Sequence, residues 1–185
     1  TIEENLEVLL KVADAVAYAH HNGVINRDLK PENIMLGEFG EVIVLDWGLS
    51  VPAPDSGKSK FASSTASIGA GIAAYMAPEL WAGPTEMIGR GSDIYLLGAI
   101  LYEILSGHPP HAFANPSGHG QATVIQIIDS VLRPNVIAPT QIKGELMDIA
   151  MEAMRTRPED RHQSVQEFQV AIRNYQRHEE SRTLT

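Results

Sequence analysis

The segment from Ser92 to Leu105 limits the possible folds more than any other part of the sequence. Ser92 can cap a helix there, and Asp93 suits the positive end of the helix dipole. Apolar residues then cover nearly every face of the helix: Ile94, Leu96, Leu97, Ala99, Ile100, Leu101, Ile104 and Leu105. A helix that is apolar on all sides must be buried, so we expect other elements to surround it.

Four further helices are predicted. The first begins at a capping box of Thr1 and Glu4 and ends at Asn22-Gly23, with His20 in the core and His21 at the surface. The other three are expected over 124–132, 146–154 and 164–175, the last one starting at a Ser164-x-x-Glu167 capping box.

Two short apolar runs, 34–36 and 42–45, flank a Gly37–Gly40 turn and predict a β-ribbon. The fold class is therefore α+β, mainly α. We expect one domain over residues 1–178 and a polar tail over 179–185.

Composition excludes several classes of protein. The net charge of −9, without any basic block, argues against nucleic acid as a partner. The absence of cysteine excludes disulfides and thiolate metal sites. The spacing of His108, His111 and His119 matches no standard zinc site. No signal peptide or membrane-spanning run is visible in this chain, so we expect a cytoplasmic location, with an anchor outside the chain left open.

Three motifs carry the chemistry: Asn26-Arg27-Asp28-Leu29-Lys30-Pro31-Glu32-Asn33, Asp46-Trp47-Gly48 and Ala77-Pro78-Glu79. In phosphoryl transfer, one carboxylate accepts the proton of the attacking hydroxyl, while an amide oxygen and a second carboxylate hold magnesium. Asp28, Asn33 and Asp46 supply that set, and Lys30 adds a cation for the group in flight. Taken alone, an Asp-x-x-x-x-Asn pattern such as Asp28 to Asn33 would usually be a capped turn.

The ordered set of motifs resembles the C-terminal lobe of a eukaryotic-type, bacterial Pkn-like serine/threonine protein kinase, over residues 1–175. The resemblance implies ATP and Mg²⁺, with Mn²⁺ as a substitute, and a protein substrate. It makes Asp28 and Lys30 catalytic and Asn33 and Asp46 the metal ligands. It assigns cofactor contacts to Lys30, Glu32, Asn33, Met35 and Asp46, although Met35 could as well be a plain core residue.

The same resemblance implies structural roles for three further residues. Asp93 would hold the backbone of the catalytic loop, and Arg161 would pair with Glu79. Residues 46–79 would form the activation segment, with phosphorylation expected among four hydroxyls that a phosphate could bring to Arg27: Ser63, Ser64, Thr65 and Ser67. A merely flexible polar linker is the alternative for this stretch.

The sequence contains no Gly-x-Gly-x-x-Gly loop, so the small ATP-binding lobe is expected to be absent from this chain. The isolated chain should then be inactive and could self-associate through its exposed lobe interface.

Two departures from the kinase pattern favour another function, a pseudokinase-like scaffold. Asn26 replaces the usual His and should weaken the coupling of the loop to the activation segment. Ile72 replaces a Thr whose hydroxyl would bridge Asp28 and Lys30. Trp47 in place of Phe is a milder change. A small-molecule phosphotransferase, the third hypothesis, gives no reason for the Ala77-Pro78-Glu79 motif.

Overall fold

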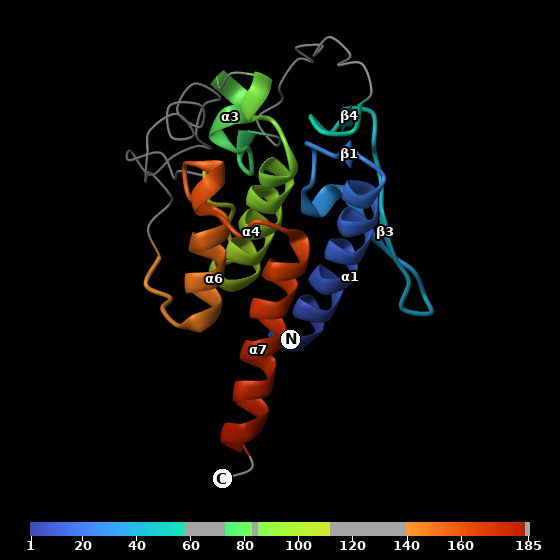
Figure 1. Cartoon of the computed structure of the whole chain (residues 1–185). Coiled ribbons are helices and arrows are strands. Elements are labelled where there is room, and N and C mark those ends of the chain that lie inside the picture. The colour runs from blue at the N-terminus through green and yellow to red at the C-terminus, as the bar shows by residue number, and fades with distance from the viewer. Residues whose placement is uncertain (58–72, 83–84, 112–139, 184–185) are drawn as a thin grey trace, which may run out of the picture.

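The computed structural model describes residues 1–57, 73–82, 85–111 and 140–183. Its centre is α4 (Arg90–Ser106), which packs against α1 (Ile2–His21) on one side and α6 (Glu145–Ala153) on the other. Helix α7 (Val165–Thr183) contacts both α1 and α6, so the four helices form a closed ring of contacts (Figure 1). The mainly helical α+β class is confirmed.

Helix α4 is buried from Ser92 to Tyr102, as its apolar faces predict. Its start differs from the prediction, because Gly89 and not Ser92 is the N-cap. The Ser92 hydroxyl instead accepts a hydrogen bond from the Gly89 N–H at 3.3 Å and donates one to Glu79 Oε1 at 2.8 Å. An N-cap residue lies just before the helix, whereas Ser92 lies within its first turn, where its hydroxyl can reach Glu79. Gly107, at φ 78°, ends the helix in the left-handed conformation that favours glycine.

Helix α1 begins as predicted, with the complete capping box of Thr1 and Glu4. His20 is buried and His21 is exposed, also as predicted. At the start of α7 the capping box is only half formed. Ser164 accepts the Glu167 N–H at 3.1 Å, but the Glu167 carboxylate accepts from the N–H of Gln163 at 2.8 Å.

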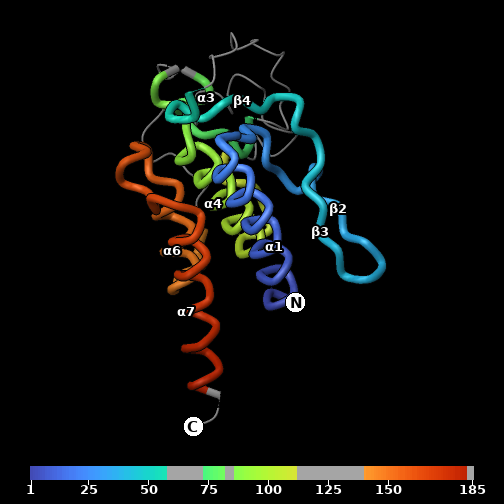
Figure 2. The backbone as a smooth tube through the Cα atoms, turned by 45° about the vertical axis from the view of Figure 1, so that its right-hand side comes forward, coloured from blue at the N-terminus to red at the C-terminus, as the bar shows by residue number. Residues whose placement is uncertain are grey.

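Two antiparallel strand pairs adjoin the helices. The predicted ribbon is present as β2 (Ile34–Leu36) paired with β3 (Val42–Val44). The other pair, β1 (Val24–Ile25) with β4 (Val51–Pro52), was not predicted, because two residues are too few to show a strand period. In Figure 1 both pairs lie on the α1 side of the lobe, away from α6 and α7, and Figure 2 shows the β2–β3 ribbon beside α1.

Short helices connect these elements: η1 (Pro31–Asn33), α3 (Pro78–Ala82), η2 (Thr85–Met87) and η3 (Pro158–Asp160). Helix α7 extends past the other helices in both views and continues through most of the predicted polar tail (Figures 1 and 2). The helix expected over 124–132 lies outside the described residues. None of the described helices combines the length and the apolar character needed to span a bilayer.

Helices α4 and α6 lie close together at Gly98. A Cβ atom at this position would lie 2.6 Å from the Cβ of Ala153 and 3.1 Å from the carbonyl oxygen of Ala150. Only glycine therefore allows the two helices this separation, and Gly98 stays in α4 despite the poor helix propensity of glycine.

We expect Gly98→Ala to lower the free energy of unfolding by about 1–3 kcal/mol, the usual cost of overpacking a dense interior. Urea denaturation of the chain measures this. Adding Ala153→Gly removes the nearest clashing atom, so the double variant should lose less than the sum of the two single changes. A Gly98→Ala chain as stable as the parent would show that the helices separate freely.

Candidate active site

The buried carboxylate of Asp93 holds the loop that carries the catalytic motif. Its Oδ2 accepts the backbone N–H of Asn26 and its Oδ1 that of Arg27, each at 2.8 Å. His20 Nε2 lies 2.7 Å from Oδ2, and since an ionised carboxylate only accepts, this nitrogen carries the proton. Asp93 is fully buried, so these three donors offset the cost of removing its charge from water. The predicted contact of Asp93 with the loop backbone is present.

The loop places three side chains of the motif together. Lys30 Nζ lies 3.1 and 3.3 Å from the two carboxylate oxygens of Asp28. Asn33 Nδ2 donates to the Asp28 carbonyl oxygen at 2.8 Å and to Asp28 Oδ2 at 3.0 Å. Asp28 is buried and Lys30 and Asn33 are half-buried, so the carboxylate has a fixed direction.

Asp46 lies beside this loop because the Leu45 N–H donates to the Asn33 carbonyl oxygen at 2.7 Å. Asp46 is exposed, has a left-handed φ of 53°, and accepts the Gly48 N–H on Oδ1 at 3.1 Å. Since Asn33 turns its Nδ2 to Asp28, its Oδ1 is the atom suited to a cation. An amide oxygen and a carboxylate are the hard ligands that Mg²⁺ accepts alongside phosphate and water, so the donor set fits this metal. No group of three or more His, Asp and Glu side chains gathers as a metal site within the described ranges.

Arg27 links the loop to the segment that follows Asp46. Its Nε donates to the carbonyl oxygen of Leu49 at 2.6 Å, and its own φ is 71°. Partial burial lowers the pKa of the guanidinium, and the Asp93 carboxylate opposes this shift.

The predicted pairing of Arg161 with Glu79 is present and fully buried. Nη1 donates to Oε1 at 2.7 Å and Nη2 to Oε2 at 2.9 Å, a bidentate geometry. The same guanidinium lies 4.9 Å from the centre of the Tyr95 ring and donates to three backbone carbonyls, those of Gly91, Arg155 and Thr156. The pair therefore joins α3, α4 and the turn before η3.

An apolar row on the β-ribbon is exposed. It consists of Met35, its cross-strand partner Ile43, and Leu45, with Phe39 in the connecting turn; Leu36 is also exposed, but on the opposite face of β2. Met35, 47% exposed, is not the plain core residue that was the alternative for it. Glu32 is also exposed, on η1. A row of this kind usually meets another body, because large apolar side chains are rarely left together in water.

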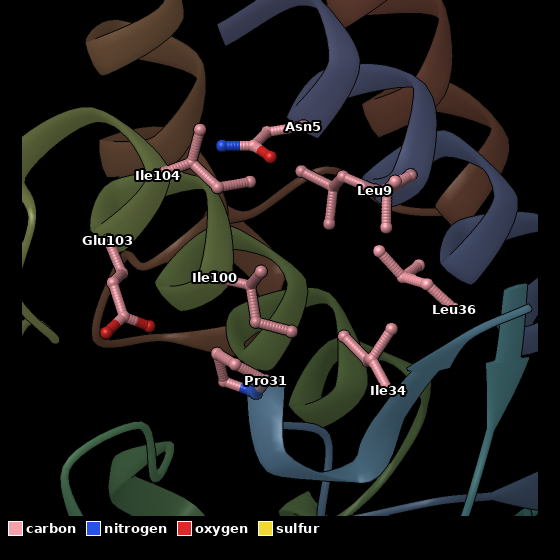
Figure 3. A pocket seen from close by; sticks show the side chains of 9 residues that line it. Asn5, Leu9, Pro31, Ile34, Leu36, Ile100, Glu103 and Ile104 are labelled. Atoms are coloured by element: carbon pink, nitrogen blue, oxygen red, sulfur yellow. The ribbon is translucent and has the colours of Figure 1, made fainter. Parts of the chain in front are cut away.

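A cavity of about 400 Å³ lies between α1, β2 and α4 (Figure 3). Apolar side chains line most of it, and the polar ones are Asn5 and Glu103. It does not include Asp28, Asn33 or Asp46. Ile34 and Leu36 line it, so it faces the side of β2 opposite Met35. Glu103 also accepts a hydrogen bond from the Tyr75 hydroxyl at 2.6 Å, and burial together with this bond raises the pKa of Tyr75.

Comparison with known proteins agrees with the geometry. Residues 2–171 match the model of the protein kinase domain. The chain belongs to the protein kinase family. It is 31% identical to the serine/threonine-protein kinase PknB of Mycobacterium tuberculosis over an alignment of 192 positions, which covers all of this chain and 29% of that protein. It is 31% identical to the serine/threonine-protein kinase PknD of Chlamydia abortus, over 92% of this chain and 19% of that protein.

A probable serine/threonine-protein kinase of Streptomyces coelicolor is 33% identical over 170 residues, 92% of this chain and 24% of that protein. The resemblance to bacterial serine/threonine kinases is thus confirmed. The chain spans about a fifth to three tenths of the length of these relatives.

Several predicted residues of the kinase activation segment lie outside the described part of the structure: Ser63, Ser64, Thr65, Ser67 and Ile72. Other contacts were not predicted. The Asn26 side chain accepts the Asp28 N–H at 2.9 Å, a turn that Asn-x-Asp permits but does not require. Trp47 Nε1 donates to the Val44 carbonyl at 3.0 Å, which no sequence pattern indicates.

Replacing Arg161 by Ala should lower the free energy of unfolding by about 3–5 kcal/mol, because it leaves the Glu79 carboxylate buried without its partner. Glu79→Ala should be of similar size. The double variant should cost less than the sum of the two, as denaturation would measure. Arg157→Ala, which breaks an exposed pair with Glu159, is the matched control and should cost under about 1 kcal/mol. Additive effects of Arg161 and Glu79 would contradict the pairing.

Proposed function

We propose that this chain serves ATP-dependent phosphoryl transfer to serine and threonine hydroxyls of proteins. It would supply the catalytic loop, the metal ligands and the activation segment of a two-lobe kinase. The proposal rests mainly on the Asp28 carboxylate, whose direction Lys30 and Asn33 fix, and on Asp46, which lies beside the same loop. The relatives are named serine/threonine-protein kinases, which supports the class of acceptor.

Asp28 acts as the proton acceptor for the attacking hydroxyl. A base must point at the proton that it removes, and two donors fix the direction of this carboxylate. Lys30 lies on the same side of the loop, where its ammonium group can stabilise negative charge on the transferred phosphoryl group. The lysine bond to Asp28 keeps both groups in one place before substrate arrives.

Asn33 Oδ1 and the Asp46 carboxylate would hold Mg²⁺ or Mn²⁺, which when bound neutralises the charge of the nucleotide phosphates. Both ligands are polar oxygen atoms on loops joined by the Leu45–Asn33 hydrogen bond, so the two sides of the metal site move together. The proposed nucleotide contacts are Met35, exposed on β2, and Glu32, exposed on η1.

The exposed apolar row of the β-ribbon is the proposed contact surface for a small ATP-binding lobe. Met35 and its cross-strand partner Ile43 lie on the paired strands, and Leu45 directly precedes the proposed metal ligand Asp46. A lobe seated here would close the nucleotide between the two lobes, and without it the row would favour self-association.

Arg27 is the proposed docking group for a phosphorylated activation segment. Arg27 directly precedes the base in the sequence, and its guanidinium reaches the segment at Leu49. A phosphate on one of the hydroxyls between 63 and 67 could form charge-assisted hydrogen bonds with it. A scaffold that binds partners without transfer is the second candidate, supported by Asn26 and Ile72.

In a protein that joins this chain to a small lobe, Asp28→Asn should reduce kcat by about a hundred-fold or more and leave ATP affinity nearly unchanged, because the base acts in the transition state. Asp46→Asn should instead weaken Mg-ATP binding by about tenfold or more, since a direct ligand matters at least as much as its supporting shell. Turnover and nucleotide titration separate the two roles.

Glu159→Gln is the control, because Glu159 is an exposed carboxylate on η3 that pairs with Arg157, outside the motif loop and outside residues 46–79. It should change neither quantity. Normal turnover of Asp28→Asn would refute its role as the base, and a parent that binds Mg-ATP without transferring phosphate would favour the scaffold.

The 185-residue chain by itself should bind Mg-ATP too weakly for calorimetry and should transfer no phosphate. It contributes one wall of the cleft, and the phosphate-binding loop and lysine belong to the other wall. Tight binding of Mg-ATP to this chain alone would contradict the division of roles between the lobes.

A further inference from the structure

The side chain of Asn26 makes a hydrogen bond on one side only. Asn26 is 1% exposed, and its Nδ2 is one of two buried side-chain polar atoms in the described part of the chain that have no hydrogen-bond partner. A buried amide donor without a partner is costly and therefore uncommon in folded proteins. The favourable contact of this side chain must therefore come from its other polar atom, the amide oxygen Oδ1.

That other atom, Oδ1, accepts the backbone N–H of Asp28 at 2.9 Å. The orientation of the amide follows from chemistry, because an amide nitrogen cannot accept a hydrogen bond. Turning the amide over would bring two donors face to face and leave the Asp28 N–H without an acceptor. The unpaired Nδ2 is thus a consequence of serving the Asp28 backbone.

The hydrogen bond from the Asp28 N–H to Asn26 is the last of three bonds made by consecutive backbone N–H groups. The backbone N–H groups of Asn26 and Arg27 donate to Asp93, and the next one, of Asp28, donates to Asn26. Arg27, in the middle, has a φ of 71°, which a residue with a β-carbon adopts only when its surroundings hold it there. Asp93 fixes the peptide groups up to Arg27, and Asn26 fixes the one that follows.

We infer that Asn26 is a positioning residue for the proton acceptor: its Oδ1 holds the peptide of Asp28 after the strained Arg27 and so sets the direction of the Asp28 carboxylate. The inference rests on the role of Asp28 proposed above. The expectation that Asn26 weakens the coupling of the loop to the activation segment concerns another contact and stays a prediction, whereas within the loop its oxygen acceptor stabilises the backbone of Asp28.

The test compares Asn26→Leu, which keeps the size and removes the acceptor, with Asn26→Ser, whose hydroxyl can accept the same N–H. Each is placed in the kinase with both lobes. Asn26→Leu should lower kcat about ten- to a hundred-fold, because a shift of about 1 Å in a catalytic group has effects of this size. The KM for ATP should stay within about two-fold, and Asn26→Ser should recover most of the loss.

Asn22→Leu is the matched control. Asn22 lies at the exposed end of α1, where its Nδ2 donates to the Tyr18 carbonyl, and the same change there should leave kcat unaltered. A folded Asn26→Leu enzyme with kcat within about two-fold of the parent would overturn the inference. Equal losses in Asn26→Leu and Asn26→Ser would do so too, because the acceptor would then not be what matters.

Amide exchange of Asp28, followed by nuclear magnetic resonance in the 185-residue chain, tests the contact without activity. The amide should be protected in the parent, exchange at least about tenfold faster in Asn26→Leu and return toward the parent rate in Asn26→Ser. If Asn26→Leu fails to fold, the Asn26→Ser variant decides: parental protection and turnover support the inference, and loss of both overturns it. A protected but inactive two-lobe parent would refute the proposed function and leave the Asn26–Asp28 contact in place.

Discussion

The buried carboxylate of Asp93 is the interaction on which the site depends. It belongs to the central helix, yet its acceptors are used by the catalytic loop and by His20 of α1. The three donors in turn stabilise the carboxylate, because a buried charge without hydrogen bonds is costly. The loop is therefore attached through its backbone to a helix that is buried from Ser92 to Tyr102, which leaves the side chains of Asp28, Lys30 and Asn33 available for chemistry.

A second buried charge pair ties the outer elements to the same helix. Arg161 reaches Glu79 from the far end of the sequence, and Ser92, near the start of α4, donates to the same carboxylate. Both Asp93 and Ser92 thus use the first turn of one helix to anchor segments that precede it in the chain. A well-packed helix can do this because its interior side chains have little freedom to follow a moving loop.

Strong periodic patterns made the long elements predictable. The all-apolar faces of α4, the capping box at Thr1 and the ribbon around Gly37–Gly40 each follow from local rules that tertiary contacts reinforce. The order of the three motifs, through the resemblance to kinases, indicated that Asp28, Lys30 and Asn33 lie together. The sequence could not indicate the pairing of β1 with β4, the shift of the N-cap from Ser92 to Gly89, or the bond from Asn26 to Asp28. Each depends on where one backbone group lies in space, and a single side chain has several partners within reach.

The contact between α7 and α1 has a consequence for synthesis in the cell. Gln169 donates to Asp14 and to the Leu10 carbonyl, residues made 155 and 159 positions earlier. At a translation rate of roughly 5–20 residues per second, the face of α1 that α7 covers stays without this neighbour for about 8–30 s after α1 itself has been synthesised. Among the described helices, α1 is thus made first and is one of the last to be fully covered, so its apolar face is where a chaperone would bind this nascent segment.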